Sequence, residues 1–139
     1  MKVGFFIPSV GRGGVESSLA KLLRSLNSPD LDLTVLYGTA PPDWLNSIKD
    51  VADLVQLDRK PFLPFTKRIF GERASISISL ISALKNHLCE SDLDVVIGYQ
   101  SGAIALFARW RAGVDIPVAV RESIVPSIAF KYESSVWSF

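Results

Sequence analysis

Short apolar runs alternate with amphipathic stretches along the first third of the chain. Residues 3–7 form a continuous apolar run closed by Pro8, and residues 33–37 form a second run that stops at Gly38. Continuous apolar runs of this length are typical of strands buried on both faces of a parallel sheet. Between them, over residues 15–26, apolar positions recur at helical spacing. The pattern predicts a strand–helix–strand unit with a right-handed crossover.

The alternation continues through the rest of the chain. Apolar segments at residues 55–57, 95–97 and 117–120 predict three more strands. A short helix is expected to open after Pro41, with Asp43 as its N-cap residue.

Three other segments differ in how clearly they indicate a structure. Residues 59–71 hold two prolines, and we expect a loop with at most a helical turn there. Residues 74–88 show both a two-residue and a four-residue apolar period. We interpret them as a helix, because the stretch is long and a parallel strand that follows it requires a crossover. Residues 103–112 are apolar nearly all round and predict a buried helix, with Gly113 at the position after the helix where glycine is favoured.

Five strands that alternate with helices predict an α/β fold. The expected architecture is one domain over residues 1–139, with a doubly wound, mainly parallel, Rossmann-like sheet and helices on both faces. Ligands of such sheets bind beyond the carboxyl ends of the strands. This rule selects four loops as candidate sites, at residues 8–14, 38–40, 98–101 and 121–123.

Composition narrows the functional classes. Apolar residues make up 48% of the chain and charged residues 21%, which is ordinary for a globular domain. The net charge of +1 provides no field that would favour nucleic acid. The chain has one cysteine, Cys89, so it cannot form an internal disulfide. Cys89 and the single histidine, His87, are too few ligands for a zinc site. The first apolar run is too short for a signal peptide or a membrane span, so we expect a cytoplasmic protein.

Charge is concentrated in one window of the chain. From Arg59 to Arg73 there are five basic residues against one acid, interspersed with phenylalanines. This mixture suits a peripheral contact with an anionic membrane surface. The alternative is a solvated loop whose phenylalanines reach back to the core. Two prolines and the lack of a clean amphipathic period favour that alternative.

The loop after the first strand is rich in glycine. Gly11, Gly13 and Gly14 allow a ligand to approach the backbone closely, and the helix that begins near Gly14 directs its positive dipole end at the loop. Phosphate is the ligand that such a loop typically binds. The dinucleotide-binding fingerprint is incomplete, because Glu16 stands where its third glycine belongs, and no Gly-Lys-Ser/Thr follows as in a P-loop. A tight turn without a ligand remains the alternative interpretation.

Two longer segments resemble one enzyme family. The opening MKVGFFIPSVGRGGVESSLAKLLRSL is similar to that of glycosyltransferase family 4, with Pro8-Ser9 followed by Gly13, Gly14 and Glu16. The segment DLDVVIGYQSGAIALFARWRAGVDIPVAVRES resembles a later strand–helix–strand stretch of the same family. The similarity is weak between about Asp43 and Leu88.

The resemblance implies the N-terminal, acceptor-binding half of a retaining enzyme with the two-domain GT-B fold. Such an enzyme moves a sugar from a nucleotide-sugar donor to a glycan or lipid-linked acceptor and requires no metal or further cofactor. By resemblance, the loop with Gly11, Gly13 and Gly14 faces the donor diphosphate. The family often carries a histidine after the fifth strand, where this chain has Arg121 and Glu122, so the catalytic residues stay unassigned. The acceptor-side candidates are Glu16, Tyr99, Gln100, Ser101, Arg121 and Glu122.

The donor half of such an enzyme is missing from this sequence. Its C-terminal domain carries two glutamates separated by seven residues, and no glutamate pair here has that spacing. We therefore expect a domain that is incomplete at its C-terminus, inactive alone, and dependent on a C-terminal domain or partner subunit. One alternative is a non-catalytic module that binds a phosphate-bearing ligand or a partner. Another is a nucleotide-binding oxidoreductase domain, against which the incomplete fingerprint argues.

Overall fold

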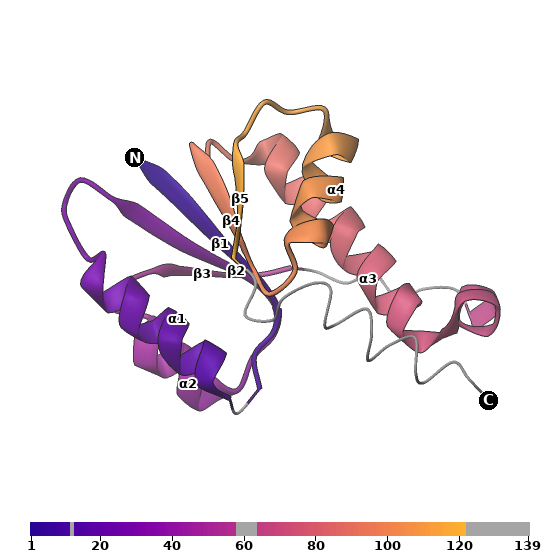
Figure 1. Ribbon diagram of the computed structural model, residues 1–139, viewed down its shortest axis with the longest axis horizontal. Helices are drawn as coiled ribbons and strands as arrows, with labels where there is room; N and C mark the ends of the chain where they lie inside the picture. Colours follow the sequence, from indigo (N-terminus) through magenta and orange to yellow (C-terminus); the bar gives the residue numbers. More distant parts are fainter. Residues whose placement is uncertain (12, 58–63, 122–139) are drawn as a thin grey trace.

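The computed structural model describes residues 1–11, 13–57 and 64–121, and for residues 64–74 it describes the backbone only. Within these ranges, five parallel strands form one sheet in the order β3-β2-β1-β4-β5 (Figure 1). Within the window from Arg59 to Arg73, residues 59–63 lie outside the described residues, and of residues 64–73 only the backbone is described. Glu122 also lies outside the described residues. The strands are β1 (Lys2–Ser9), β2 (Asp32–Thr39), β3 (Asp53–Gln56), β4 (Val95–Tyr99) and β5 (Val118–Arg121).

Helices cover both faces of the sheet, as the sequence predicts. In Figure 1, α1 and α2 lie on one face, while α3 and α4 lie on the other. The helices are α1 (Gly14–Ser25), α2 (Pro42–Ile48), α3 (Pro64–Glu90) and α4 (Gly102–Ala112). The expected doubly wound, Rossmann-like α/β architecture is therefore confirmed, with all strand pairs among the described residues parallel.

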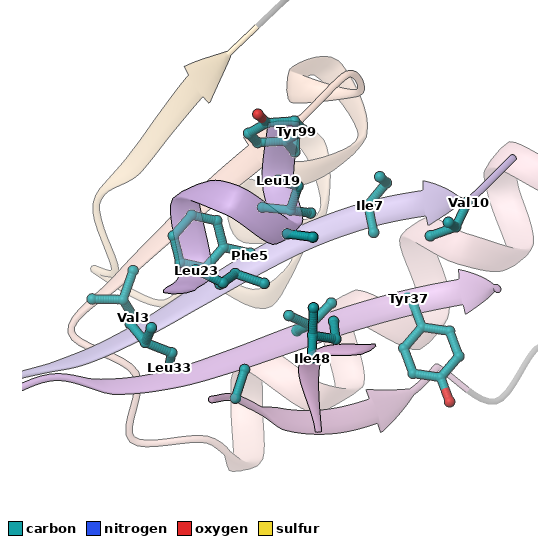
Figure 2. Packing of buried hydrophobic residues seen from close by; sticks show 13 residues of the cluster. Val3, Phe5, Ile7, Val10, Leu19, Leu23, Leu33, Tyr37, Ile48 and Tyr99 are labelled. Atoms are coloured by element: carbon teal, nitrogen blue, oxygen red, sulfur yellow. The ribbon is translucent and has the colours of Figure 1, made fainter. Parts of the chain in front are cut away.

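The central strand β1 supplies alternate side chains to two cores. Phe5 is fully buried in the core beneath α1, where Leu19 and Leu23 of that helix meet it (Figure 2). Phe6 is fully buried in the opposite core beneath α3 and α4. Successive residues of a strand point to opposite faces, so a continuous apolar run is required wherever both faces are covered. At about 1.5–3 kcal/mol for each large apolar side chain, this burial is the main stabilising contribution.

The ambiguous segment before β4 is helical, as interpreted from the sequence. Leu80, Leu84 and Leu88 of α3 are each at most 1% exposed and pack in the core with Phe6. Their four-residue spacing places them on one face of the helix. Gly113 ends α4 with φ 67°, the left-handed conformation expected after a helix.

Four expectations about the elements need correction. The third strand covers Asp53–Gln56 instead of 55–57. Helix α3 already begins at Pro64, within the expected loop, because proline is well tolerated at the first helical position, whose N–H has no partner in the helix. Asp43 lies in the first turn of α2, whose N-cap is Pro41, because the residue before a proline avoids the helical conformation. Helix α4 is not buried all round: Trp110 is 69% exposed.

Small residues explain the exposure of α4. The helix turns Gly102, Ala105 and Ala108 toward the sheet and leaves Leu106, Phe107 and Trp110 exposed. A Cβ at Gly102 would lie 2.1 Å from Cγ1 of Val120 on β5, so only glycine lets the helix approach the strand this closely. This close contact holds the start of α4 against the end of β5. The loop that connects β4 to α4 is held there as well.

Candidate functional site

The sheet changes its winding direction between β1 and β4. From β1 the chain winds outward through β2 to β3, and then returns to the other side of β1 for β4 and β5. Carboxyl ends of strands at such a switch point are where open α/β sheets bind ligands. The glycine loop after β1 and the Gln100–Ser101 turn after β4 border this point. The structure therefore brings together three of the four loops selected from the sequence, because β5 ends beside the first two at Arg121. The fourth loop, at residues 38–40, is joined to the glycine loop through Thr39.

The glycine loop is anchored on one side and open on the other. The Val10 N–H donates to the Thr39 carbonyl at 2.8 Å, which ties the loop to the end of β2. Gly13 is the N-cap residue of α1, in an extended conformation and without a side-chain cap. A Cβ at Gly14 would meet no atom of the described residues within 4 Å. The N-terminus of α1 is therefore exposed at Gly14 and has no described side chain over it, with the positive end of the helix dipole behind it.

The side chain of Glu16 folds back into the loop. Its Oε1 accepts the Gly11 N–H at 2.9 Å, and the residue is 9% exposed. A Cβ at Gly13 would lie 2.9 Å from Oε2, so the glycine at this position makes room for the carboxylate. The backbone of Glu16 in turn accepts the Trp44 indole N–H at 3.2 Å, which fastens α2 to the first turn of α1.

The environment of Glu16 keeps its carboxyl group ionised. The N–H groups of Gly11, of Glu16 itself and of Gly13 lower its pKa, and their combined effect outweighs burial, which acts in the opposite direction. Hydrogen bonds to the charged form of a carboxylate have this effect in general. Oε2 is buried and makes no hydrogen bond of good geometry within the described part of the chain. The glycine loop thus encloses a negative charge that backbone N–H groups stabilise, with no cation beside it among the described residues.

Tyr99 and Arg121 form the second part of the site. Tyr99 ends β4, is fully buried, and its hydroxyl lies 3.3 Å from Oγ of Ser18 on α1. The strand register places Arg121 beside Tyr99, with its guanidinium carbon 4.5 Å from the ring centroid. Neither contact was expected from the sequence, because Ser18 and Tyr99 are 81 residues apart. No local pattern marks a serine on a helix as the partner of a distant tyrosine.

The turn between β4 and α4 is backbone-strained. Gln100 has φ 67°, and among the described non-glycine residues it alone has a positive φ. Such a conformation costs on the order of 1 kcal/mol and is often found at functional sites. The Gln100 N–H donates to the Arg121 carbonyl at 2.9 Å, and the Ser101 hydroxyl donates to the Gln100 carbonyl at 2.7 Å. The turn and the end of β5 therefore form one connected unit.

The candidate residues fall into two groups joined by α1. Gly11, Gly13 and Glu16 lie together in the glycine loop. Tyr99, Gln100, Ser101 and Arg121 lie together at the ends of β4 and β5, and the Tyr99–Ser18 contact connects this group to α1.

In residues 1–11, 13–57 and 64–121, no group of three or more His, Cys, Asp and Glu side chains is arranged to hold a metal ion. His87 lies near the C-terminus of α3, and burial lowers its pKa more than the nearby Glu90 raises it. None of the described helices is long and apolar enough to cross a membrane.

The fold resembles parts of several solved structures. The lipopolysaccharide outer core galactosyltransferase WaaB, in its apo form, matches with a TM-score of 0.64 and 19% identity over 86% of this chain and 32% of WaaB. MurG of Acinetobacter baumannii matches with a TM-score of 0.59 and 17% identity over 94% of this chain and 38% of MurG. The C-terminal domain of the PF1911 hydrogenase from Pyrococcus furiosus matches with a TM-score of 0.54 and 15% identity over 86% of this chain and 89% of that domain.

These likenesses establish the fold. The chain spans about a third of the length of WaaB. No protein-family model and no curated protein matches the sequence. The chain is a Rossmann-like α/β domain of the kind that forms part of the galactosyltransferase WaaB.

Proposed function

We propose that this chain is the N-terminal, acceptor-binding half of a retaining glycosyltransferase. The full enzyme would move a sugar from a nucleotide-sugar donor to a glycan or lipid-linked acceptor. The observation that carries the proposal is the pairing of an open helix N-terminus at Gly14 with a cation, Arg121, at the switch point of a sheet that WaaB shares. Both features suit a ligand that carries phosphate.

On the donor side, the glycine loop is proposed to face the diphosphate. Gly11, Gly13 and Gly14 surround the N-terminus of α1, where backbone N–H groups and the helix dipole favour negative charge. The open surroundings of Gly14 support its use as the point of approach. Stabilisation of the leaving diphosphate by fixed dipoles lowers the barrier for sugar transfer, because negative charge develops on the diphosphate in the transition state.

On the acceptor side, the unit formed by Gln100, Ser101 and Arg121 is proposed to position the acceptor, with Glu122 following it in sequence. The stacking on Tyr99 limits the rotamers of the Arg121 guanidinium, so less entropy is lost when it pairs with a carboxylate or phosphate. Among the described residues, no carboxylate lies within ion-pair distance of Arg121. The guanidinium is therefore proposed to meet an anionic group of the acceptor.

Sugar transfer requires more protein than this chain. The likeness covers 32% of WaaB and 38% of MurG, so the residues that hold the nucleotide and sugar are proposed to come from a second domain or partner subunit. Transfer to a lipid-linked acceptor would take place in the cytoplasm at the inner membrane face. A membrane contact through the basic window from Arg59 to Arg73 would serve that arrangement, while the two prolines of the window favour a solvated segment.

A second candidate function is a binding module without catalysis. Its support is the likeness to the PF1911 hydrogenase domain, which is almost fully covered by this chain. One fold hosts many functions, so this likeness favours no chemistry by itself. The module would use the same switch point to bind a phosphate-bearing ligand.

Binding of a nucleotide-sugar distinguishes the proposals. We would titrate the 15N-labelled chain with UDP-galactose, UDP-N-acetylglucosamine and NADH, and follow the backbone amide signals. The glycosyltransferase proposal predicts that a UDP-sugar shifts the signals of Gly14, Tyr99 and Arg121 together. A response to NADH at the same residues and to neither UDP-sugar would reject it. A response to inorganic phosphate alone would favour the binding module.

A further inference from the structure

The glycine loop already contains an anion of its own. The Glu16 carboxylate reaches back from the first turn of α1, takes the Gly11 N–H at 2.9 Å and is 9% exposed. It occupies the space beside Gly13, where a Cβ would come within 2.9 Å of Oε2. The N–H groups that would cradle a phosphate at this end of the loop are therefore directed at a side chain of the same protein.

Among the described residues, no cation lies beside this carboxylate. Oε2 is buried and has no hydrogen-bond partner of good geometry within the described residues. Neither of the ion pairs formed by the described residues involves Glu16. A second anion at the same N–H groups would meet this charge at close range, where like charges repel. An uncharged polar group would meet no such penalty.

We propose that Glu16 is a specificity-determining residue that excludes phosphate from the Gly11 and Gly13 end of the glycine loop. An anionic ligand is then left with the N-terminus of α1 at Gly14, where a Cβ would meet none of the described atoms within 4 Å. The part of the ligand that lies against Gly11 and Gly13 carries no negative charge. The placement of the ligand rests on the function proposed above. In that case the diphosphate lies at Gly14 and uncharged hydroxyl groups lie at Gly11.

Removal of the internal anion tests the inference directly. We would titrate the 15N-labelled chain with inorganic pyrophosphate and compare the wild type with Glu16→Ala and Glu16→Gln. In the wild type, the Gly11 and Gly13 amide signals are expected to stay in place. In Glu16→Ala both signals should move saturably, with roughly tenfold or greater tightening of pyrophosphate binding. Glu16→Gln removes the charge but keeps the side chain, so a smaller gain is expected.

Asp43→Asn is the matched control. Asp43 is exposed and lies in the first turn of α2, so this change removes one negative charge at another helix N-terminus without touching the glycine loop. It should leave pyrophosphate binding at the wild-type value. An equal gain in Asp43→Asn would assign the effect to net charge and overturn the inference.

Two further outcomes would also overturn it. Either the wild-type Gly11 and Gly13 signals respond saturably to pyrophosphate, or the folded Glu16 variants bind it no more tightly than the wild type. If Glu16→Ala does not fold, the comparison is decided by Glu16→Gln. Failure of the proposed function looks different: UDP-sugars would then leave all variants unchanged while pyrophosphate still distinguishes Glu16→Ala from the wild type.

Discussion

The guanidinium of Arg121 lies over the face of Tyr99, with its carbon 4.5 Å from the ring centroid. Tyr99 is fully buried, and its hydroxyl lies 3.3 Å from the Ser18 hydroxyl of α1. A cation placed over a fixed ring in this way gains about 0.5–1 kcal/mol at an exposed site and has fewer orientations to lose when it binds a ligand. The contact joins the end of β5 to α1 through the side chain that ends β4.

Tyr99→Phe should keep the ring under Arg121 and remove the hydroxyl bonded to Ser18. The expected loss in the free energy of unfolding is about 0.5–1.5 kcal/mol, the usual net value of one hydrogen bond. Urea denaturation measures it. Ser18→Ala should cause a similar loss, and the double variant should lose no more than either single variant. Full additivity of the two changes would show that the hydroxyls do not interact.

Gly13→Ala should destabilise the loop, while Gly14→Ala should not. An alanine Cβ at position 13 would lie 2.9 Å from Oε2 of Glu16, whereas at position 14 it would contact no part of the described chain within 4 Å. The carboxylate is the end of a flexible side chain and can move away, so the expected cost is that of its hydrogen bond to Gly11, about 0.5–1.5 kcal/mol. Thermal unfolding of both variants checks the difference. Combining Gly13→Ala with Glu16→Ala should relieve the crowding, and a double variant as unstable as the sum of both would contradict this explanation.

Gly102→Ala should push α4 away from β5. The new Cβ would lie 2.1 Å from Cγ1 of Val120 and 2.8 Å from its Cβ, so a rotamer change of Val120 alone cannot relieve the clash. We expect a loss of about 1–3 kcal/mol in the free energy of unfolding. Val120→Ala should recover part of it in the double variant. Ala103→Ser, at the next and exposed position of α4, serves as the control and should have little effect on stability.

The pH dependence of stability should include a contribution from Glu16. Its folded-state pKa is lowered, first by the Gly11 N–H, so folding favours the ionised form. The stabilisation is therefore fully present above the unfolded pKa of about 4.5 and is lost as the pH falls through the lower folded-state pKa. Glu16→Gln should be less stable than the wild type at pH 7, and the gap should narrow below about pH 4. Urea midpoints across this range test the expectation, and a gap independent of pH would refute it.

The strands of the central sheet were predictable because burial on both faces dictates their composition. Every residue from Val3 to Ile7 in β1 is buried, so the run must be apolar or glycine throughout, and this pattern is visible in the sequence. The four-residue spacing of Leu80, Leu84 and Leu88 identified α3 in the same way. The start of α3 was missed because Pro64 is compatible with both a loop and the first position of a helix.

The sequence by itself determined the alternation of strands and helices, because the spacing of apolar residues in each element matches the way that element is buried. It also placed the glycine loop and Arg121 at strand ends, since parallel strands bring their carboxyl ends to one edge of the sheet. Only the tertiary structure decided that Glu16 turns into the glycine loop and that Tyr99 contacts Ser18 and Arg121. The exposed outer face of α4 was likewise decided by packing, through the glycine and alanines that face the sheet. Such contacts join residues that are distant in sequence or depend on side-chain direction, and neither is encoded in a local period.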